Sequence, residues 1–194
     1  MKHINQMQYD WLSYPTTIEL DAPLSPPYPS VAKAGCGLCS ACMVVEELTG
    51  IALSVEACVQ LSVSLGANYF GTDMKKLGKG LEEKYRLCMK LSNDVEELVN
   101  HLTGGGVAIV NVGKPHGVFS EGGHFIFAQR YEDGRIWLSD PSFTKEKYQQ
   151  PHRKNAVKLE AGYVIARPET VAEESANRDP AFYLFQKDGP GRDR

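Results

Sequence analysis

The chain has 194 residues, of which 42% are hydrophobic and 23% charged, enough to form one globular domain, residues 1–194, with its own core. The formal net charge of -3 lacks the basic surplus that binding to nucleic acid or anionic lipid requires. No apolar run approaches the ~20 residues of a membrane-spanning helix, and the first residues lack the pattern of a signal peptide. These features predict a cytoplasmic protein that does not insert into membranes.

The first half of the chain carries an arm and then helical patterns. Five prolines between Tyr14 and Ser30 predict an irregular arm, residues 1–35. Apolar residues at helical spacing predict a helix over 38–48 that ends before Gly50. Further helices are predicted from the N-cap Ser54 to about Leu65, after Thr72-Asp73, and from the N-cap Asn93, with Glu96 completing a capping box, to Gly104. Residues 36–104 are therefore predicted to be a helical half, with Cys58 and Cys88 inside its helices.

The second half changes to short apolar runs that are typical of strands. They cover residues 107–112, 124–131, 135–139, 163–167 and 182–186. A short helix is expected over 168–174, and residues 188–194 read as a polar tail. The order predicts an α+β fold, in which the helical half is followed by an antiparallel sheet formed by residues 105–187.

The cysteines give the first indication of chemistry. There are five, and an odd number without a signal peptide argues against a disulfide framework, so we expect reduced thiols of which one reacts. Cys36 lies between Gly35 and Gly37 at the start of the predicted helix 38–48. There, unpaired N–H groups and the helix dipole favour a thiolate, and the small neighbours leave the Cys36 amide free to bind an oxyanion.

A thiol nucleophile needs a base, and the base needs a residue that orients it. His124 follows a Gly-rich loop and opens an apolar strand, and the next strand ends in Asp140. A three-residue hairpin loop over 132–134 would place residue 126 opposite Asp140 and bring His124 to the same face, whereas a two-residue loop would place them on opposite faces. His116, in a loop rich in glycine and proline, is the alternative base.

Two motifs carry a resemblance to a known family. The run 34–44, Ala-Gly-Cys-Gly-Leu-Cys-Ser-Ala-Cys-Met-Val, resembles the Gly-Cys-Gly-Pro-Thr-Ser-x-x-Met-Val helix start of the C39-like cysteine peptidases, which belong to the papain-like superfamily. Gly123-His124-Phe125-Ile126, followed by Asp140-Pro141, resembles that family's histidine strand and Asp-Pro motif. The resemblance covers about residues 4–142. It implies a papain-like fold in which Cys36 attacks a peptide carbonyl, His124 transfers the proton and Asp140 orients the histidine.

The resemblance also implies an oxyanion-hole glutamine upstream of the cysteine. Gln6 occupies this place in a stretch similar to the family's Ile-x-Gln-x-x-x-x-Trp opening, and Gln8 is the nearby competitor. Two departures are visible: Leu38-Cys39 replaces Pro-Thr, and the proline-rich arm lengthens the distance along the chain between Gln6 and Cys36.

Other interpretations use the same cysteines. Cys36 and Cys39 form a C-x-x-C at a helix N-terminus, as in thiol-disulfide redox proteins, although a proline-rich arm rather than a strand precedes them. Cys36, Cys39 and Cys42 lack the fourth ligand of an iron-sulfur or zinc site, because residue 46 is Glu. A papain-like fold with an idle triad, used for binding, is a third possibility.

The sequence therefore predicts a cysteine peptidase or a related thiol hydrolase or acyltransferase. Its catalytic residues are predicted to be Cys36, His124, Asp140 and Gln6, and its partner a peptide or protein substrate. No metal or cofactor is expected, and Cys42, Cys58 and Cys88 are expected to serve packing.

Overall fold

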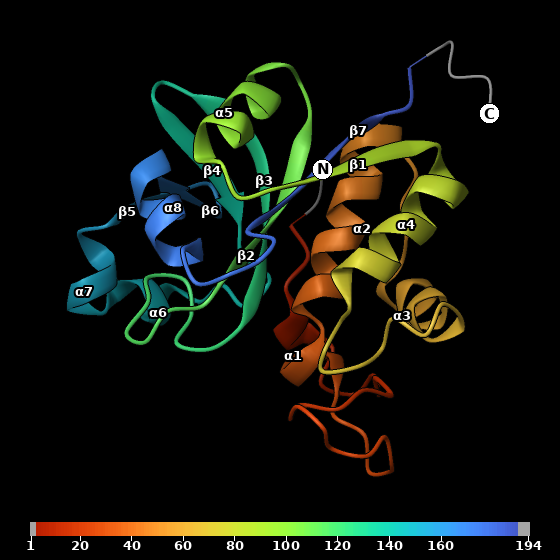
Figure 1. The fold of residues 1–194 in the computed structure, drawn as a ribbon. Coiled ribbons are helices and arrows are strands. Elements are labelled where there is room, and N and C mark those ends of the chain that lie inside the picture. Colours follow the sequence, from red (N-terminus) through yellow and green to blue (C-terminus); the bar gives the residue numbers. More distant parts are fainter. Residues whose placement is uncertain (1–2, 190–194) are drawn as a thin grey trace.

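Seven strands form the centre of the molecule. This computed structural model describes residues 3–189, so most of the predicted tail 188–194 lies outside the described residues. The strands are β1 (Leu87–Ser92), β2 (Val107–Val112), β3 (His124–Glu132), β4 (Arg135–Ser139), β5 (Val157–Glu160), β6 (Tyr163–Ala166) and β7 (Phe182–Lys187). They join one antiparallel sheet in the order β1-β7-β2-β3-β4-β6-β5 (Figure 1).

The helices form before, between and after these strands. They are the 3-10 helix η1 (Gln6–Gln8) and the α-helices α1 (Val31–Ala34), α2 (Cys36–Thr49), α3 (Val55–Ser64), α4 (Met74–Tyr85), α5 (Val95–Thr103), α6 (Lys145–Gln149), α7 (Pro151–Lys154) and α8 (Pro168–Ser175). The predicted caps Ser54 and Gly50 are present: Ser54 accepts a hydrogen bond from the third residue after it, and Gly50 ends α2 with a φ of 75°. Asp73, which precedes α4, accepts a hydrogen bond in the same way as Ser54. The mixture of helices and antiparallel strands agrees with the predicted α+β class.

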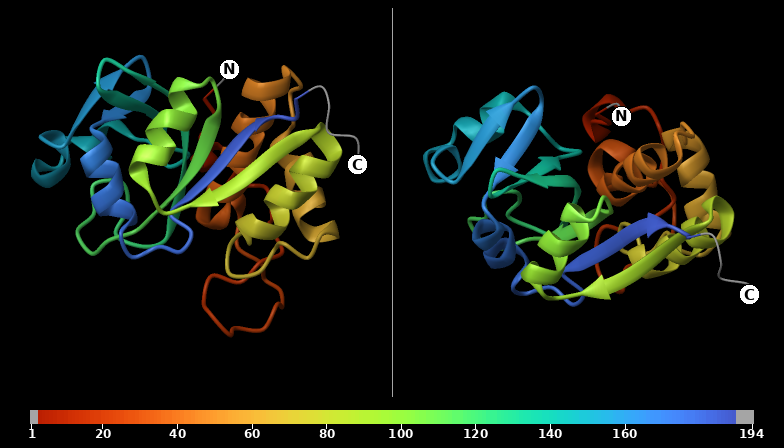
Figure 2. Two further views of the ribbon diagram at one scale, coloured as in Figure 1. Left: turned by 45° about the horizontal axis from the view of Figure 1, so that its top comes forward. Right: turned by 90° about the horizontal axis from the view of Figure 1, so that it is seen from above.

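Two hydrophobic cores lie on opposite faces of the central strands. Ile109 of β2 and Phe127 of β3 pack into a core with α2, α3 and α4, whereas their neighbours Val110 and Ile126 pack into a second core with α5 and α8. Alternate strand residues point to opposite faces, so both faces of these strands are covered and the strands read as continuous apolar runs. Figure 2 shows the two groups of helices on either side of the central strands.

Helix α2 occupies the middle of the first core. Ten of its 14 residues are buried, including Cys39, Cys42 and Met43. A helix that is apolar on nearly every side has to be enclosed by other elements, and here β2, β3, α3 and α4 enclose it. The first turn of α2 is thereby held against the sheet beside the start of β3.

The structure corrects several boundaries. Residues 87–92 form strand β1 rather than part of a helical half, because they pair with the distant strand β7, and Cys88 therefore lies in a strand and not in a helix. The N-cap of α5 is Asp94, whose carboxylate accepts from the Glu96 amide, while the Asn93 side chain bonds to Ala181 and Asp179 instead. Helices α6 and α7 and strand β5 had no predicted counterpart.

Within residues 3–189, none of the helices combines the length and the apolar character needed to cross a membrane.

Candidate active site

Cys36 is the first residue of α2, directly after the short helix α1 and Gly35. Burial raises the pKa of its thiol, but a hydrogen bond with His124, the charge of His124, and bonds from the backbone N–H groups of Phe125 and Gly37 lower it, and the net pKa lies below the ordinary value. The N-terminal end of the helix dipole acts in the same direction. The site therefore favours a thiolate at Cys36.

Gly37 allows the first turn of α2 to approach its neighbours closely. A Cβ atom at this position would lie 2.8 Å from Cβ and 3.0 Å from Oγ1 of Thr72. Thr72 also lines the cleft in front of Cys36. A glycine after the cysteine is thus a packing requirement of this site.

His124 opens β3 and is buried, with 6% of its surface exposed. Its Nε2 lies 2.7 Å from Oδ1 of Asp140, which leaves Nδ1 as the ring nitrogen for the thiol of Cys36. Burial lowers the pKa of His124, but the charge and hydrogen bond of Asp140, followed by those of Cys36, raise it to about 9. An imidazolium between a thiolate and a carboxylate is the favoured state.

Asp140 is enclosed by hydrogen-bond donors that sequence reasoning missed. Its Oδ1 accepts from the Ser142 amide at 2.8 Å and from the Ser142 hydroxyl at 3.0 Å, and its Oδ2 accepts from Lys147 Nζ at 2.6 Å and from the Tyr148 hydroxyl at 2.7 Å. Burial raises the pKa of the carboxyl, but the charge and hydrogen bond of His124, and then those of Lys147, hold it well below its usual range. The carboxylate stays ionised next to the histidine.

One of these donors had a signal in the sequence, and two had none. An Asp side chain commonly bonds the amide two residues on, so Asp140-Pro141-Ser142 could have been read as an Asx turn. Lys147 and Tyr148 lie on α6, which had no periodic pattern that would predict a helix.

The hairpin that brings His124 and Asp140 together is not the predicted one. Its loop has two residues, Asp133 and Gly134, both with positive φ (50° and 73°), and Glu132 pairs with Arg135, so the three-residue loop over 132–134 is wrong. A β-bulge between Ala128 and Arg130 then shifts the register by one residue, and Phe127 pairs with Ser139. The two-residue loop alone would have placed His124 and Asp140 on opposite faces of the sheet, and the bulge brings them back to the same face.

Gln6 and Gln8 occupy different environments. Gln6 is buried on η1, whereas Gln8 is exposed. The Gln6 amide donates from Nε2 to the Ala32 carbonyl at 2.8 Å, and its backbone N–H donates to Pro141 at 2.7 Å. Gln6 thus lies between the helix before Cys36 and the turn after Asp140, and no hydrogen bond among the described residues joins it to Cys36.

The proline-rich arm leaves the core and returns to nearly the same place. Ser13 and Ser30 form an antiparallel bridge, and the flanking bonds from Tyr14 to Pro29 and from Val31 to Leu12 both measure 2.8 Å. The residues between Ser13 and Ser30 therefore form a loop whose two ends lie side by side. The added chain length therefore does not move Gln6 away from α1.

The residues of the alternative interpretations lie elsewhere. Cys39 is fully buried, and burial, then Cys36 and Cys58, raise the pKa of its thiol well above the ordinary value, so it is a poor partner in thiolate exchange. His116 is exposed in the loop before β3. In the part of the chain that the structure describes, no three His, Cys, Asp or Glu side chains gather as they would around a metal ion.

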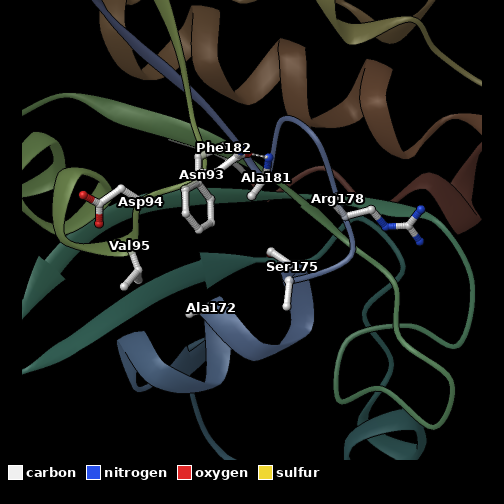
Figure 3. Close-up of a pocket in the computed structure, with 9 residues that line it drawn as sticks. Asn93, Asp94, Val95, Ala172, Ser175, Arg178, Ala181 and Phe182 are labelled. Atoms are coloured by element: carbon white, nitrogen blue, oxygen red, sulfur yellow. Dashed lines mark hydrogen bonds between the residues drawn. The ribbon is translucent and has the colours of Figure 1, made fainter.

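A cleft of about 400 Å³ opens in front of Cys36 and His124. Ile18 of the arm, Phe70 and Phe125 supply apolar surface to it, and Lys33 and Arg178 supply positive charge. A second hollow of about 500 Å³, between α5 and the end of α8, is lined by neither cysteine nor histidine (Figure 3). Cys36 and His124 are therefore associated with the first cleft.

Comparisons with known proteins bear on the fold. No family model matches the sequence. No curated protein matches it. Among solved structures, a protein described as a C39-like peptidase from Bacillus anthracis is similar with a TM-score of 0.53 and 10% identity, over 79% of this chain and 89% of that chain.

A double glycine motif protease from an AMS/PCAT transporter, solved in complex with its leader peptide, has a TM-score of 0.49 and 16% identity, over 91% of this chain and 94% of that chain. At these identities the likeness concerns the fold alone, and the first of the two structures carries it: the chain is similar in fold to a C39-like peptidase.

Proposed function

We propose that the protein is a cysteine peptidase, or a closely related thiol acyl hydrolase, that cleaves a peptide or amide bond through Cys36, His124 and Asp140. The observation that carries the proposal is the chain of contacts from the Cys36 thiol to the His124 imidazole to the Asp140 carboxylate, in which the first two residues line an open cleft. Structural ion pairs also perturb pKa values, but they do not usually place a nucleophile at a helix N-terminus within an open cleft.

The first half of the reaction forms a thioester. The Cys36 thiolate attacks the carbonyl carbon, and the carbonyl electrons move onto oxygen. The Cys36 N–H, which has no acceptor within α2 because it belongs to the first residue, and the second N–H of the Gln6 amide donate to this oxyanion. When the intermediate collapses, the carbon–nitrogen bond breaks and the His124 imidazolium gives its proton to the leaving amine.

The second half regenerates the enzyme. His124, now neutral, takes a proton from water, the resulting hydroxide attacks the thioester carbonyl, and the carbon–sulfur bond breaks to release the acid and the thiolate. An amine in place of water would give acyl transfer by the same steps. Throughout, Asp140 holds the imidazole through Nε2 and stabilises its positive charge.

The proposal is tested by the pH profile of Cys36 alkylation with iodoacetamide, read by mass spectrometry of the Cys36 peptide. Wild-type protein should react at pH values where an ordinary thiol is still protonated, and His124→Ala should lose this reactivity. His116→Ala is the matched control and should behave as the wild type, because His116 is exposed in the preceding loop. A His124→Ala profile that coincides with the wild type contradicts the proposal.

A further inference from the structure

The cleft in front of Cys36 has an uneven distribution of charge. Lys33 and Arg178 line it together with the cationic His124, and none of the described residues that line it is Asp or Glu. Within a cleft of low polarity such an excess attracts anionic ligands and is weakly screened. The cation of His124 is already balanced by Cys36 and Asp140, so the unbalanced charges are those of Lys33 and Arg178.

Arg178 is held at the sheet side of the cleft, next to the catalytic strand. Its Nη2 donates to the Gly113 carbonyl at 3.0 Å, and a Cβ atom on Gly123, the residue before His124, would lie 3.7 Å from the same nitrogen. A Cβ on Gly113 would approach this nitrogen to 1.9 Å, so a glycine is needed for the guanidinium to lie here. Arg178 also contributes to the lining of the second hollow, but Figure 3 shows its guanidinium extending away from Asn93 and Phe182.

This guanidinium has donors to spare. Arginine carries five N–H donors, and Gly113 is the acceptor that the structure provides among the described residues. Its Nε is buried and lacks an acceptor, and none of the ion pairs of residues 3–189 includes Arg178. The neighbouring carboxylate, Asp179, accepts from Asn93 instead. A positioned guanidinium without a carboxylate, in a substrate cleft, is suited to a planar anionic group.

We propose that Arg178 binds a carboxylate of the substrate beside the bond that Cys36 attacks. The substrate class is then a peptide with Glu or Asp, or with a free C-terminal carboxylate, next to the scissile bond, and Ile18 and Phe70 provide apolar surface for the rest of it. Lys33 of α1 adds a second positive charge to the lining. This inference rests on the proposed function, because it uses the thiolate as the reacting atom.

The first arm of the test needs no known substrate. Iodoacetate and iodoacetamide both alkylate a thiolate with loss of iodide, but iodoacetate carries a carboxylate and iodoacetamide the neutral amide. The ratio of their rates at Cys36 should fall roughly threefold to tenfold in Arg178→Gln, since a nearby positive charge is lost, and remain near the wild-type value in Arg178→Lys. The ratio at the half-buried Cys88 of the same sample is the internal reference.

The second arm separates the two sources of the carboxylate. A peptide library is digested, and the cleaved sequences are resynthesised as pairs that differ only in Glu against Gln, or in a free against an amidated C-terminus. Wild-type protein should prefer the carboxylate member of one pair by roughly 10- to 100-fold in kcat/KM, and Arg178→Gln should abolish the preference. The pair that shows the preference identifies the source.

Lys114→Gln is the matched control for both arms. It removes the same charge one residue after Gly113, but Lys114 lines a different hollow, with Glu173. Thermal unfolding of each variant shows whether it is folded, and Arg178→Lys keeps the inference testable if Arg178→Gln is not.

The outcomes distinguish the two proposals. A loss of either the iodoacetate preference or the acidic-peptide preference in Arg178→Gln, but not in Lys114→Gln, supports the inference. If Cys36 is hyperreactive and peptides are cleaved, but neither preference depends on Arg178, the inference is overturned while the proposed function stands. If Cys36 reacts no faster than a model thiol and no peptide is cleaved, the proposed function itself fails.

Discussion

Lys147 Nζ lies 2.6 Å from Oδ2 of Asp140, the carboxylate whose Oδ1 accepts from His124 Nε2 at 2.7 Å. The Asp140 carboxylate is thus shared between a histidine and a lysine of the following helix, α6. The lysine side chain is only 14% exposed, so the pair is largely shielded from water. Lys147 helps to keep the Asp140 carboxylate ionised. Its positive charge also limits how far the same carboxylate can raise the pKa of His124.

Replacing Lys147 by Met separates these two effects. Without the neighbouring cation, the pKa of His124 should move further upward, and the protein should lose about 1 to 3 kcal/mol of unfolding free energy, because a buried charge loses one of its donors. NMR titration of the His124 ring and urea denaturation measure the two effects. Lys145→Met, on the exposed side of the same helix, should change neither, and an unchanged His124 titration in Lys147→Met would contradict the shared-carboxylate interpretation.

Tyr148→Phe removes one hydroxyl and leaves the packing. The Tyr148 ring stacks on Phe143 with centroids 5.7 Å apart, and its hydroxyl donates to Asp140 at 2.7 Å. The variant should unfold about 1 kcal/mol more easily and alkylate Cys36 more slowly at neutral pH, since the carboxylate is held less firmly. Tyr131→Phe, which leaves the contacts of Asp140 unchanged, is the control. Equal effects of both substitutions would contradict the role of the Tyr148 hydroxyl in holding the Asp140 carboxylate.

The raised pKa of His124 predicts a pH dependence of stability. A group whose folded pKa of about 9 exceeds its unfolded value of 6.5 stabilises the fold fully below pH 6.5, and this contribution is lost as the pH rises toward 9. A shift of this size corresponds to about 3 kcal/mol. The lowered pKa of Cys36 acts in the opposite direction, because a stabilised thiolate adds stability as the pH rises.

The measurement therefore uses a Cys36→Ala background. Unfolding free energies of Cys36→Ala should fall as the pH rises from 6, over a window that ends below pH 9 because the contribution of Cys36 to the raised pKa of His124 is absent, and those of Cys36→Ala/His124→Gln should vary much less. Parallel curves for the two proteins would show that folding does not shift the pKa of His124, and would contradict this prediction.

Gly37→Ala tests the close approach of α2 to Thr72. The added methyl cannot be accommodated at 2.8 Å from Thr72 Cβ, so the first turn of α2 has to move, and we expect about 1 to 3 kcal/mol of destabilisation together with slower alkylation of Cys36. Gly122→Ala is the control, since a Cβ there meets no atom within 4 Å. Thermal unfolding and alkylation rates give both readouts, and a Gly37→Ala protein as stable and reactive as Gly122→Ala would contradict this account.

What could be predicted from the sequence depended on whether the signal was local. The ends of α2, α3 and α4 were predicted because Gly50, Ser54 and Asp73 cap them through bonds within a few residues. Strand β1 was missed because its partner β7 lies about a hundred residues away along the chain, and no local pattern reports such pairing. Lys147 and Tyr148 were missed for a related reason: Asp140 is recognisable beside its proline, but the donors around it come from a helix without an amphipathic period.

The sequence correctly predicted that His124 and Asp140 lie on the same face of the sheet, although the predicted loop length was wrong. The reason lies in how the loop and the bulge of this hairpin combine. The two-residue loop and the bulge at residue 129 each change the pairing by one step, and at His124 the two changes cancel. A three-residue loop without a bulge would join Phe127 to Ser139 by a chain of the same length. What the site constrains is therefore whether the number of residues between His124 and Asp140 is odd or even. A single insertion or deletion between the two residues turns His124 to the opposite face of the sheet from Asp140. A paired change, one residue at the loop and one at the bulge, leaves both on the same face.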